Sequence, residues 1–126
     1  MLAGINILLV EDNLLNQKIG KYALAKHHAN VTTSESGMEA LDLLRRNEFD
    51  IVLMDIHMPG IDGYETTRII RSDLKSTIPV IALTASIADE DEQPTGLEAV
   101  NATISKPFDT DDLCALILKL TAKPDQ

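Results

Sequence analysis

The chain has 126 residues, of which 44% are hydrophobic, a size and composition that predict a single folded domain over residues 1–126. Its net charge of −9 argues against direct binding to nucleic acid or to a membrane, because both surfaces are anionic. The single cysteine, Cys114, excludes an internal disulfide. No signal peptide and no apolar stretch of about 20 residues is visible, so we expect a cytoplasmic protein.

Five strand-like runs alternate along the chain with stretches of helical periodicity. The first and third runs are rich in Ile, Val and Leu and lack Gly and Pro, which is typical of strands buried on both faces of a parallel sheet. The expected strands cover residues 5–10, 30–33, 51–54, 79–83 and 101–104. This alternation with short connections predicts an α/β domain with a parallel sheet.

Four of the helices are predicted from the spacing of their apolar residues. The first begins near Asn13, and we expect its buried face to carry Leu15, Ile19, Tyr22 and Ala23. The second covers residues 37–46, with an inward face of Met38, Leu41 and Leu44. The third follows Asp62, its expected cap, and runs through Tyr64, Thr67 and Ile70. The fifth follows Pro107, with Asp109 as N-cap, and buries Leu113, Leu116, Ile117 and Leu120.

The fourth helix is the least regular of the expected elements. Residues 86–100 should contain it, but Pro94 and Gly96 interrupt the stretch. Proline inside a helix costs about 3 kcal/mol and glycine about 1 kcal/mol. We therefore expect a short helix that ends before Pro94, with the acidic run at residues 89–92 on a solvated surface.

Polar side chains follow the strands at the points where the strands end. Glu11 and Asp12 follow the first strand, Asp55 the third, Thr84 the fourth and Lys106 the fifth. The carboxyl ends of parallel strands meet at one edge of a sheet, where α/β proteins bind their ligands. Converging carboxylates repel one another, so we expect a cation between them, with Mg²⁺ as the simplest candidate and Lys106 as a second counter-charge.

These residue types are sufficient for phosphoryl transfer. Asp12 and Asp55 can supply the hard oxygen ligands that Mg²⁺ prefers. Asp55 can also act as a nucleophile and form an acyl phosphate. Lys106 can hold a phosphoryl oxygen as a point charge, and Thr84 can donate its hydroxyl to another. Such reactions depend mainly on positioning and charge neutralisation.

Four motifs, in this order along the chain, resemble those of one known family. They lie at residues 10–13 (Val-Glu-Asp-Asn), 54–63 (Met-Asp-Ile-His-Met-Pro-Gly-Ile-Asp-Gly), 84–85 (Thr-Ala) and 106–108 (Lys-Pro-Phe). The sequence resembles the receiver domain of bacterial two-component response regulators. The resemblance implies a flavodoxin-like three-layer sandwich, with a five-stranded parallel sheet in order 2-1-3-4-5 flanked by five helices, the fourth short or irregular.

The resemblance also implies a role for each site residue. Asp55 would be the phosphoacceptor, taking a phosphoryl group from phosphohistidine on a histidine kinase or a histidine phosphotransfer domain. Asp12 and Asp55 would bind Mg²⁺ directly, Glu11 through water and His57 through its backbone carbonyl. Thr84 and Lys106 would complete the catalytic set. We expect self-catalysed phosphorylation and slow dephosphorylation rather than an independent turnover enzyme.

Residues 10–17 and the short segment before the first strand resemble receivers fused to hybrid sensor histidine kinases. We therefore expect a module from a longer chain, with residues 1–4 as a linker remnant and 122–126 as a flexible tail. The parent chain would then be a histidine kinase, which could itself be membrane-bound with this module in the cytosol. A stand-alone response regulator remains the alternative. The partner is expected to dock on the first helix, and a homodimer is left open.

Thr103 departs from the family pattern, which usually has Tyr or Phe three residues before the lysine. In the family this ring follows the threonine hydroxyl inward on phosphorylation, and Thr103 cannot act as such a ring. The phosphoryl chemistry should survive, because Thr103 is outside the site. The usual readout by the fourth helix, fifth strand and fifth helix should differ, and Pro94 and Gly96 favour a mobile, atypical fourth helix.

Two other functions fit parts of the pattern. A Mg²⁺ phosphatase with an aspartyl nucleophile would have a second Asp two residues after the nucleophile, where this chain has His57. A pseudo-receiver, an interaction module that does not respond to phosphate, would bind no Mg²⁺. The acidic pair Glu11 and Asp12, together with Thr84 and Lys106, argues against the pseudo-receiver.

Overall fold

The computed structural model describes residues 2–56, 63–84, 100–105 and 109–121, which contain five strands and four helices. The elements are β1 (Asn6–Val10), α1 (Leu14–Ala25), β2 (Asn30–Ser34), α2 (Gly37–Arg46), β3 (Ile51–Asp55), α3 (Gly63–Ser72), β4 (Val80–Thr84), β5 (Ala102–Ser105) and α4 (Thr110–Thr121). All five expected strands are confirmed, and each end lies within one residue of its predicted position.

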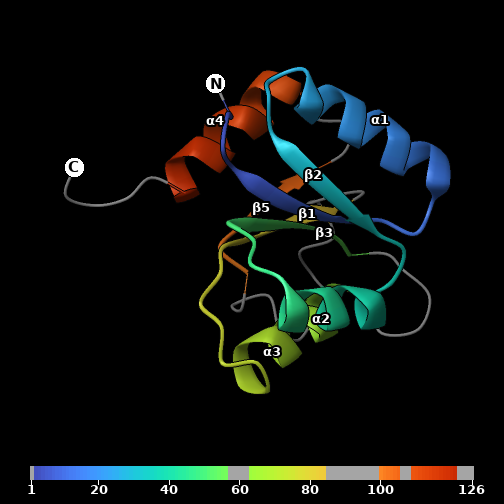
Figure 1. The fold of residues 1–126 in the computed structure, drawn as a ribbon, viewed down its shortest axis with the longest axis vertical. Helices are drawn as coiled ribbons and strands as arrows, with labels where there is room; N and C mark the ends of the chain where they lie inside the picture. Colours follow the sequence, from blue (N-terminus) through green and yellow to red (C-terminus); the bar gives the residue numbers. More distant parts are fainter. Residues whose placement is uncertain (1, 57–62, 85–99, 106–108, 122–126) are drawn as a thin grey trace.

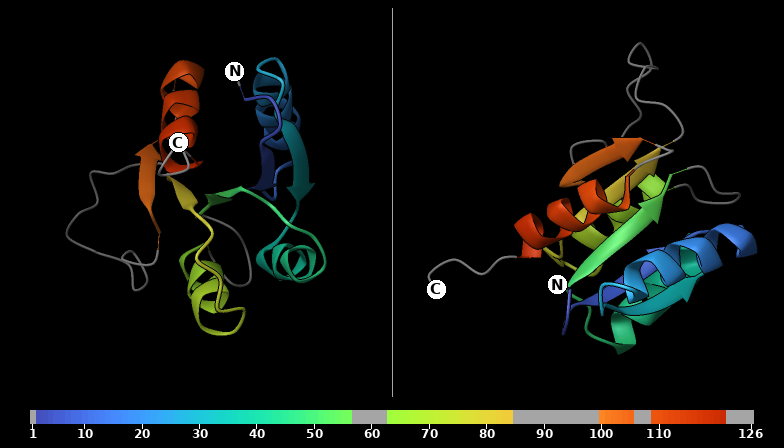
Figure 2. Two further views of the ribbon diagram at one scale, coloured as in Figure 1. Left: turned by 60° about the vertical axis from the view of Figure 1, so that its left-hand side comes forward. Right: turned by 90° about the horizontal axis from the view of Figure 1, so that it is seen from above.

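The strands form one parallel sheet in the order β2-β1-β3-β4-β5. Helices α1 and α4 cover one face of this sheet, and α2 and α3 cover the other (Figures 1 and 2). This arrangement confirms the three-layer, flavodoxin-like fold. The expected fourth helix falls almost wholly in residues 85–99, outside the described part, so α4 is the fifth helix of the prediction.

The core lies on both faces of the sheet because neighbouring residues of a strand point to opposite sides. On one face, Ile7, Leu9 and Leu53 pack with α1 and α4, which contribute Leu24, Leu113, Cys114 and Ile117. On the other face, strand residues pack with α2 and α3 through Leu8, Val10, Met54, Leu41 and Ile70. Burial raises the pKa of the Cys114 thiol, with a smaller contribution from Asp111, as fits a cysteine used for packing.

Helix α1 faces the sheet with a different side from the predicted one. Leu15, Ile19 and Tyr22 are 66%, 58% and 68% exposed, so the prediction that they face inward is wrong, and Ala23 is half-buried. The buried residues of α1 are Gln17 and Leu24, which lie on the opposite side of the helix. Glycine allows this close packing, because a Cβ at Gly20 would lie 3.0 Å from a methyl carbon of Leu9.

Helix α2 has the predicted bounds, but one of its expected core residues is exposed. Ser36 is the N-cap, and its hydroxyl accepts a hydrogen bond from the Glu39 amide at 3.1 Å. Leu41 is buried and Leu44 half-buried, as predicted. Met38 is exposed, which corrects the prediction. The reason is that the buried stripe is centred on Gly37, Ala40 and Leu41 and leaves Met38 outside it.

The predicted buried faces of α3 and α4 are confirmed. Tyr64, Thr67 and Ile70 of α3 are buried. Asp109 is confirmed as the N-cap of α4, since its Oδ1 accepts a hydrogen bond from the Asp111 amide at 2.9 Å. The inner face of α4 consists of the buried Leu113 and Ile117 and the half-buried Leu116 and Leu120. Among the helices of the described ranges, none has the length and apolar character that a membrane span requires.

Candidate functional site at the carboxyl edge of the sheet

The register of the strands brings the predicted site residues to the same level of one sheet edge. Val10 at the end of β1 pairs with Met54 in β3, so Glu11 and Asp55, the next residues, lie side by side. Asp55 pairs with Leu83 in β4, and Thr84 follows one residue further. Residues far apart in the sequence therefore meet because the parallel strands end together.

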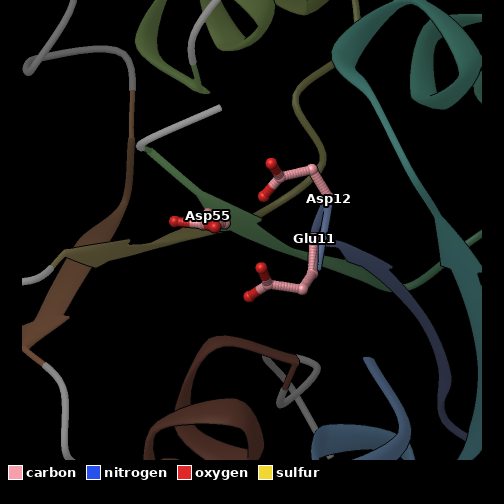
Figure 3. A group of neighbouring side chains, drawn as sticks. All are labelled: Glu11, Asp12 and Asp55. Atoms are coloured by element: carbon pink, nitrogen blue, oxygen red, sulfur yellow. The ribbon is translucent and has the colours of Figure 1, made fainter. Parts of the chain in front are cut away.

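Three carboxylates converge at this edge. Glu11, Asp12 and Asp55 each place one carboxylate oxygen within 4.8 Å of the others. Figure 3 shows the side chains of Glu11 and Asp12 extending from the end of β1 toward the side on which Asp55 lies. Glu11 and Asp55 are 4% and 3% exposed, whereas Asp12 faces solvent.

This donor set fits Mg²⁺. Magnesium prefers oxygen ligands, keeps several waters and is usually held by one or two carboxylates. Asp12 and Asp55 can supply the direct carboxylate ligands of such a site, and the exposure of Asp12 leaves room for water on the metal. Burial of neighbouring carboxylates is costly unless positive charge compensates them, which makes a cation the natural occupant.

Hydrogen bonds from backbone amides to backbone and side-chain oxygens hold the connection between β1 and α1 in place. The Glu11 amide donates to the Ser34 carbonyl at 2.9 Å, and the Asn13 amide donates to Oε2 of Glu11 at 3.2 Å. Asn13 caps α1, because its Oδ1 accepts a hydrogen bond from the Asn16 amide at 2.9 Å. The helix therefore begins where the sequence predicts, directly after the acidic pair.

Thr84 is a buried polar residue with an unsatisfied hydroxyl. Its side chain is 7% exposed, and Oγ1 has no hydrogen-bond partner among the described residues. A buried hydroxyl without a partner costs free energy, so such a group is expected mainly where a ligand completes it. Thr84 is thus placed to donate to a group bound beside Asp55.

Two predicted site residues, His57 and Lys106, lie outside the described residues, and so do Asp62, Pro107 and the acidic run at 89–92. Lys106 directly follows Ser105, whose Cα partner across the sheet is Thr84. The structure thus brings together Glu11, Asp12, Asp55 and Thr84, and the roles of all six residues remain predictions.

The sequence did not lead us to predict one residue at this edge. Gln17 of α1 is 7% exposed and donates from Nε2 to the Glu11 carbonyl at 2.6 Å. It was missed because the apolar spacing of α1 predicted the opposite inner face. A usable signal was its position seven residues before Leu24, the spacing of two helical turns.

Comparisons with known proteins agree with this geometry. The family described as response regulator receiver domain matches residues 7–118. The chain is 42% identical over 128 residues to hybrid signal transduction histidine kinase M of Dictyostelium discoideum, covering 95% of this chain and 5% of that protein. It is 34% identical to transcription factor SKN7 of Saccharomyces cerevisiae, covering 92% of this chain and 18% of the relative. The chain thus spans a small part of these curated relatives.

Two solved structures are similar over nearly the whole chain. A receiver domain of a Pseudomonas aeruginosa sensor histidine kinase, crystallised with a magnesium ion in its active-site cleft, is 35% identical with a TM-score of 0.86, covering 96% of this chain and 100% of that one. A receiver domain of a Saccharomyces cerevisiae response regulator, in complex with a histidine phosphotransfer signalling protein, is 27% identical with a TM-score of 0.85, covering 96% of this chain and 91% of that one.

The family match, the strand order and the acidic cluster at the sheet edge lead to one conclusion. This chain belongs to the response regulator receiver domain family of two-component signalling.

Proposed function

We propose that the chain is a Mg²⁺-dependent phosphoacceptor that takes a phosphoryl group from phosphohistidine onto Asp55. The observation that carries this proposal is the juxtaposition of the Asp55 carboxylate with two further carboxylates and with the unsatisfied Thr84 hydroxyl. A nucleophilic carboxylate, a cation site and a free donor at one sheet edge are the parts that phosphoryl transfer needs.

The reaction is a displacement at phosphorus. A carboxylate oxygen of Asp55 forms the new bond to phosphorus while the bond from phosphorus to the histidine nitrogen breaks, and that nitrogen leaves with the electron pair. Thr84 donates its hydroxyl to one phosphoryl oxygen, and Lys106 balances the charge on another. Water later attacks the acyl phosphate, which releases inorganic phosphate and regenerates the carboxylate.

Asp12 and Asp55 would hold Mg²⁺ directly, Glu11 through a water molecule and His57 through its backbone carbonyl. When bound, the cation neutralises charge on the carboxylates and on the transferred group. The burial of Glu11 and Asp55 excludes bulk water from their side of the site, so the field between these groups is screened less than it would be in solution.

The chain's place in a larger protein is part of this proposal. It spans only 5% of the hybrid histidine kinase that it resembles and 18% of the transcription factor. We favour the cytoplasmic receiver module of a hybrid sensor kinase, because that relative shares 42% identity over 95% of this chain. A stand-alone response regulator is the second candidate.

The exposed apolar side of α1 is a suitable docking surface for a phosphotransfer partner. Leu15, Ile19 and Tyr22 gather on this side, and α1 begins directly after the acidic pair. Exposed lysines, Lys18 and Lys21, accompany them, and α1 contains no acidic residue although the chain carries a net charge of −9. An apolar surface with basic neighbours fits a histidine phosphotransfer domain that presents an apolar patch and acidic residues around its phosphohistidine.

Labelling with radioactive acetyl phosphate tests the nucleophile. The wild-type protein should become labelled only when Mg²⁺ is present, and Asp55→Asn should abolish the label because an amide oxygen is a poor nucleophile. Asp42→Asn is the matched control, since Asp42 is an exposed aspartate on α2. Labelling that persists in Asp55→Asn would contradict the assignment. Wild-type protein that neither binds Mg²⁺ nor accepts label would favour a pseudo-receiver, and multiple turnover of phosphate esters would favour a phosphatase.

A further inference from the structure

Gln17 is a buried polar side chain for which the proposed chemistry has no direct use. It lies on the inner side of α1, about one turn after the N-cap Asn13. Its Nε2 lies 2.6 Å from the Glu11 carbonyl oxygen and 3.4 Å from the Ser34 carbonyl oxygen. Gln17 therefore joins three elements: the helix that carries it and the ends of β1 and β2.

The chemistry of these contacts fixes the orientation of the side-chain amide. Both neighbours are carbonyl oxygens, which can only accept hydrogen bonds, so the nitrogen of Gln17 must face them. The Ser34 carbonyl also accepts a hydrogen bond from the Glu11 amide at 2.9 Å. Glu11 is thus held at its amide by β2 and at its carbonyl by α1.

The peptide held in this way leads directly to a predicted metal ligand. The carbonyl of Glu11 belongs to the peptide bond that continues into Asp12, and this bond is planar. A rotation of the peptide would swing the Asp12 carboxylate away from Asp55. Because the three carboxylate oxygens lie within 4.8 Å of one another, their mutual repulsion favours such a rotation whenever no cation is bound.

We propose that Gln17 is a positioning residue for the metal site, which holds the Glu11–Asp12 peptide against carboxylate repulsion and keeps Asp12 ready to bind Mg²⁺. The inference rests on the proposed function, since it assumes that the acidic cluster binds this cation. The amide nitrogen of Gln17 bonds to backbone carbonyls and not to a carboxylate, so Gln17 would act through the backbone and not as a metal ligand. Its loss should weaken Mg²⁺ binding without removing any ligand.

Gln17→Met tests the proposal, because methionine has a similar length and no donor. We expect the dissociation constant for Mg²⁺, measured by two-dimensional amide NMR during a titration with MgCl₂, to rise about tenfold, at the low end of what outer-shell changes cost metal sites. Ile117→Val is the control. It trims a buried residue of α4, so it lowers stability without altering the connection between β1 and α1.

The control separates positioning from general loss of stability, which urea unfolding measures in parallel. A Mg²⁺ affinity of Gln17→Met equal to that of wild type or of Ile117→Val would overturn the inference and leave the phosphoacceptor proposal intact. Wild-type protein without Mg²⁺ affinity would instead overturn the phosphoacceptor proposal. If Gln17→Met does not fold, Gln17→Asn keeps the amide but shortens its reach, and it should weaken binding in the same direction.

Discussion

Thr84 shows how a single residue can reveal a site. Its hydroxyl is buried at the end of β4 and lacks a partner among the described residues. Leaving a buried polar group unsatisfied costs about 1–3 kcal/mol, so folding gains nothing from this hydroxyl. We infer that a group bound at the neighbouring Asp55 supplies the missing hydrogen-bond partner.

Stability and function should respond to Thr84→Val in opposite directions. Valine has nearly the same shape and no polar atom, so we expect the free energy of unfolding in urea to rise by about 1 kcal/mol. The rate of labelling by acetyl phosphate should fall by about two orders of magnitude, as for the loss of one preorganised donor. Thr32→Val, at an exposed position of β2, should leave labelling unchanged. A Thr84→Val protein that is less stable than wild type would refute this account.

The residues of the site differ in how far the sequence could identify them. Glu11, Asp12, Asp55 and Thr84 were predicted to meet because each directly follows or ends an apolar strand, and parallel strands end at one edge. Gln17 could not be identified in this way. Its contacts depend on which side of α1 faces the sheet, and apolar spacing alone predicted the wrong side.

At the scale of elements, α3 is fixed closely to the strand that carries Asp55. A Cβ added at Gly63, the first residue of α3, would lie 2.7 Å from the Asp55 carbonyl oxygen and 2.6 Å from the Ile56 side chain. The Gly63 amide also donates to the Ile56 carbonyl at 3.1 Å. The end of β3 and the start of α3 are thus in direct contact beside Asp55, the proposed phosphoacceptor.

Gly63→Ala should therefore disturb both stability and the site. The added methyl group meets backbone atoms that cannot move aside, so we expect the free energy of unfolding to fall by about 2 kcal/mol. The rate at which acetyl phosphate labels Asp55 should also fall in Gly63→Ala. Gly20→Ala is the matched control, because its methyl group would meet only a flexible end of Leu9 at 3.0 Å. Alanine favours the helix by about 1 kcal/mol, which offsets part of the cost of moving the Leu9 side chain, so Gly20→Ala should lose less stability than Gly63→Ala. Equal effects at the two glycines would contradict the argument.

Strand β5 carries Thr103, the residue that departs from the usual family pattern. Thr103 pairs with Ala82 of β4 and is half-buried, so a small polar residue occupies the position that is usually aromatic in the family. We propose that phosphorylation is read out differently here and that the fourth helix, which falls almost wholly outside the described residues, is mobile and atypical. Its test is amide exchange across residues 88–99, which should be faster than in α3 and α4 if the fourth helix is atypical.

At the scale of the whole molecule, the net charge of −9 sets what can approach the site. Acidic surfaces repel anions, so a phosphorylated donor needs a specific approach path. Helix α1 offers one, because its exposed side combines apolar residues with Lys18 and Lys21 and contains no carboxylate. A protein donor can use this surface, whereas a small donor such as acetyl phosphate has no need of it.

Ile19→Ser separates these two donors. Ile19 is 58% exposed, so the substitution should change stability by no more than about 0.5 kcal/mol. Transfer from a phosphorylated histidine phosphotransfer domain should slow about tenfold, as for the loss of one central interface contact. Labelling by acetyl phosphate should not change. Leu118→Ser is the control, since Leu118 is an exposed leucine near the C-terminal end of α4, away from the site edge. If both donors slow equally, α1 is not the docking surface.

The sequence by itself determined the α/β class of this protein and the sheet edge at which its candidate site lies. Runs such as residues 51–54 are apolar at every position, which is typical of a strand buried on both faces, and acidic residues follow the first and third strands. These are local properties, so they can be read along the chain.

Only the tertiary structure decided which side of α1 is buried, and with it both Gln17 and the exposed Ile19. The helix offers an apolar stripe on one side and a mixed side with Gly20 on the other. Local spacing favours burial of the apolar stripe. The close approach that Gly20 permits against Leu9, and the hydrogen bonds that Gln17 makes to two strand ends, exist only after the sheet has formed, and they determine the orientation of the helix.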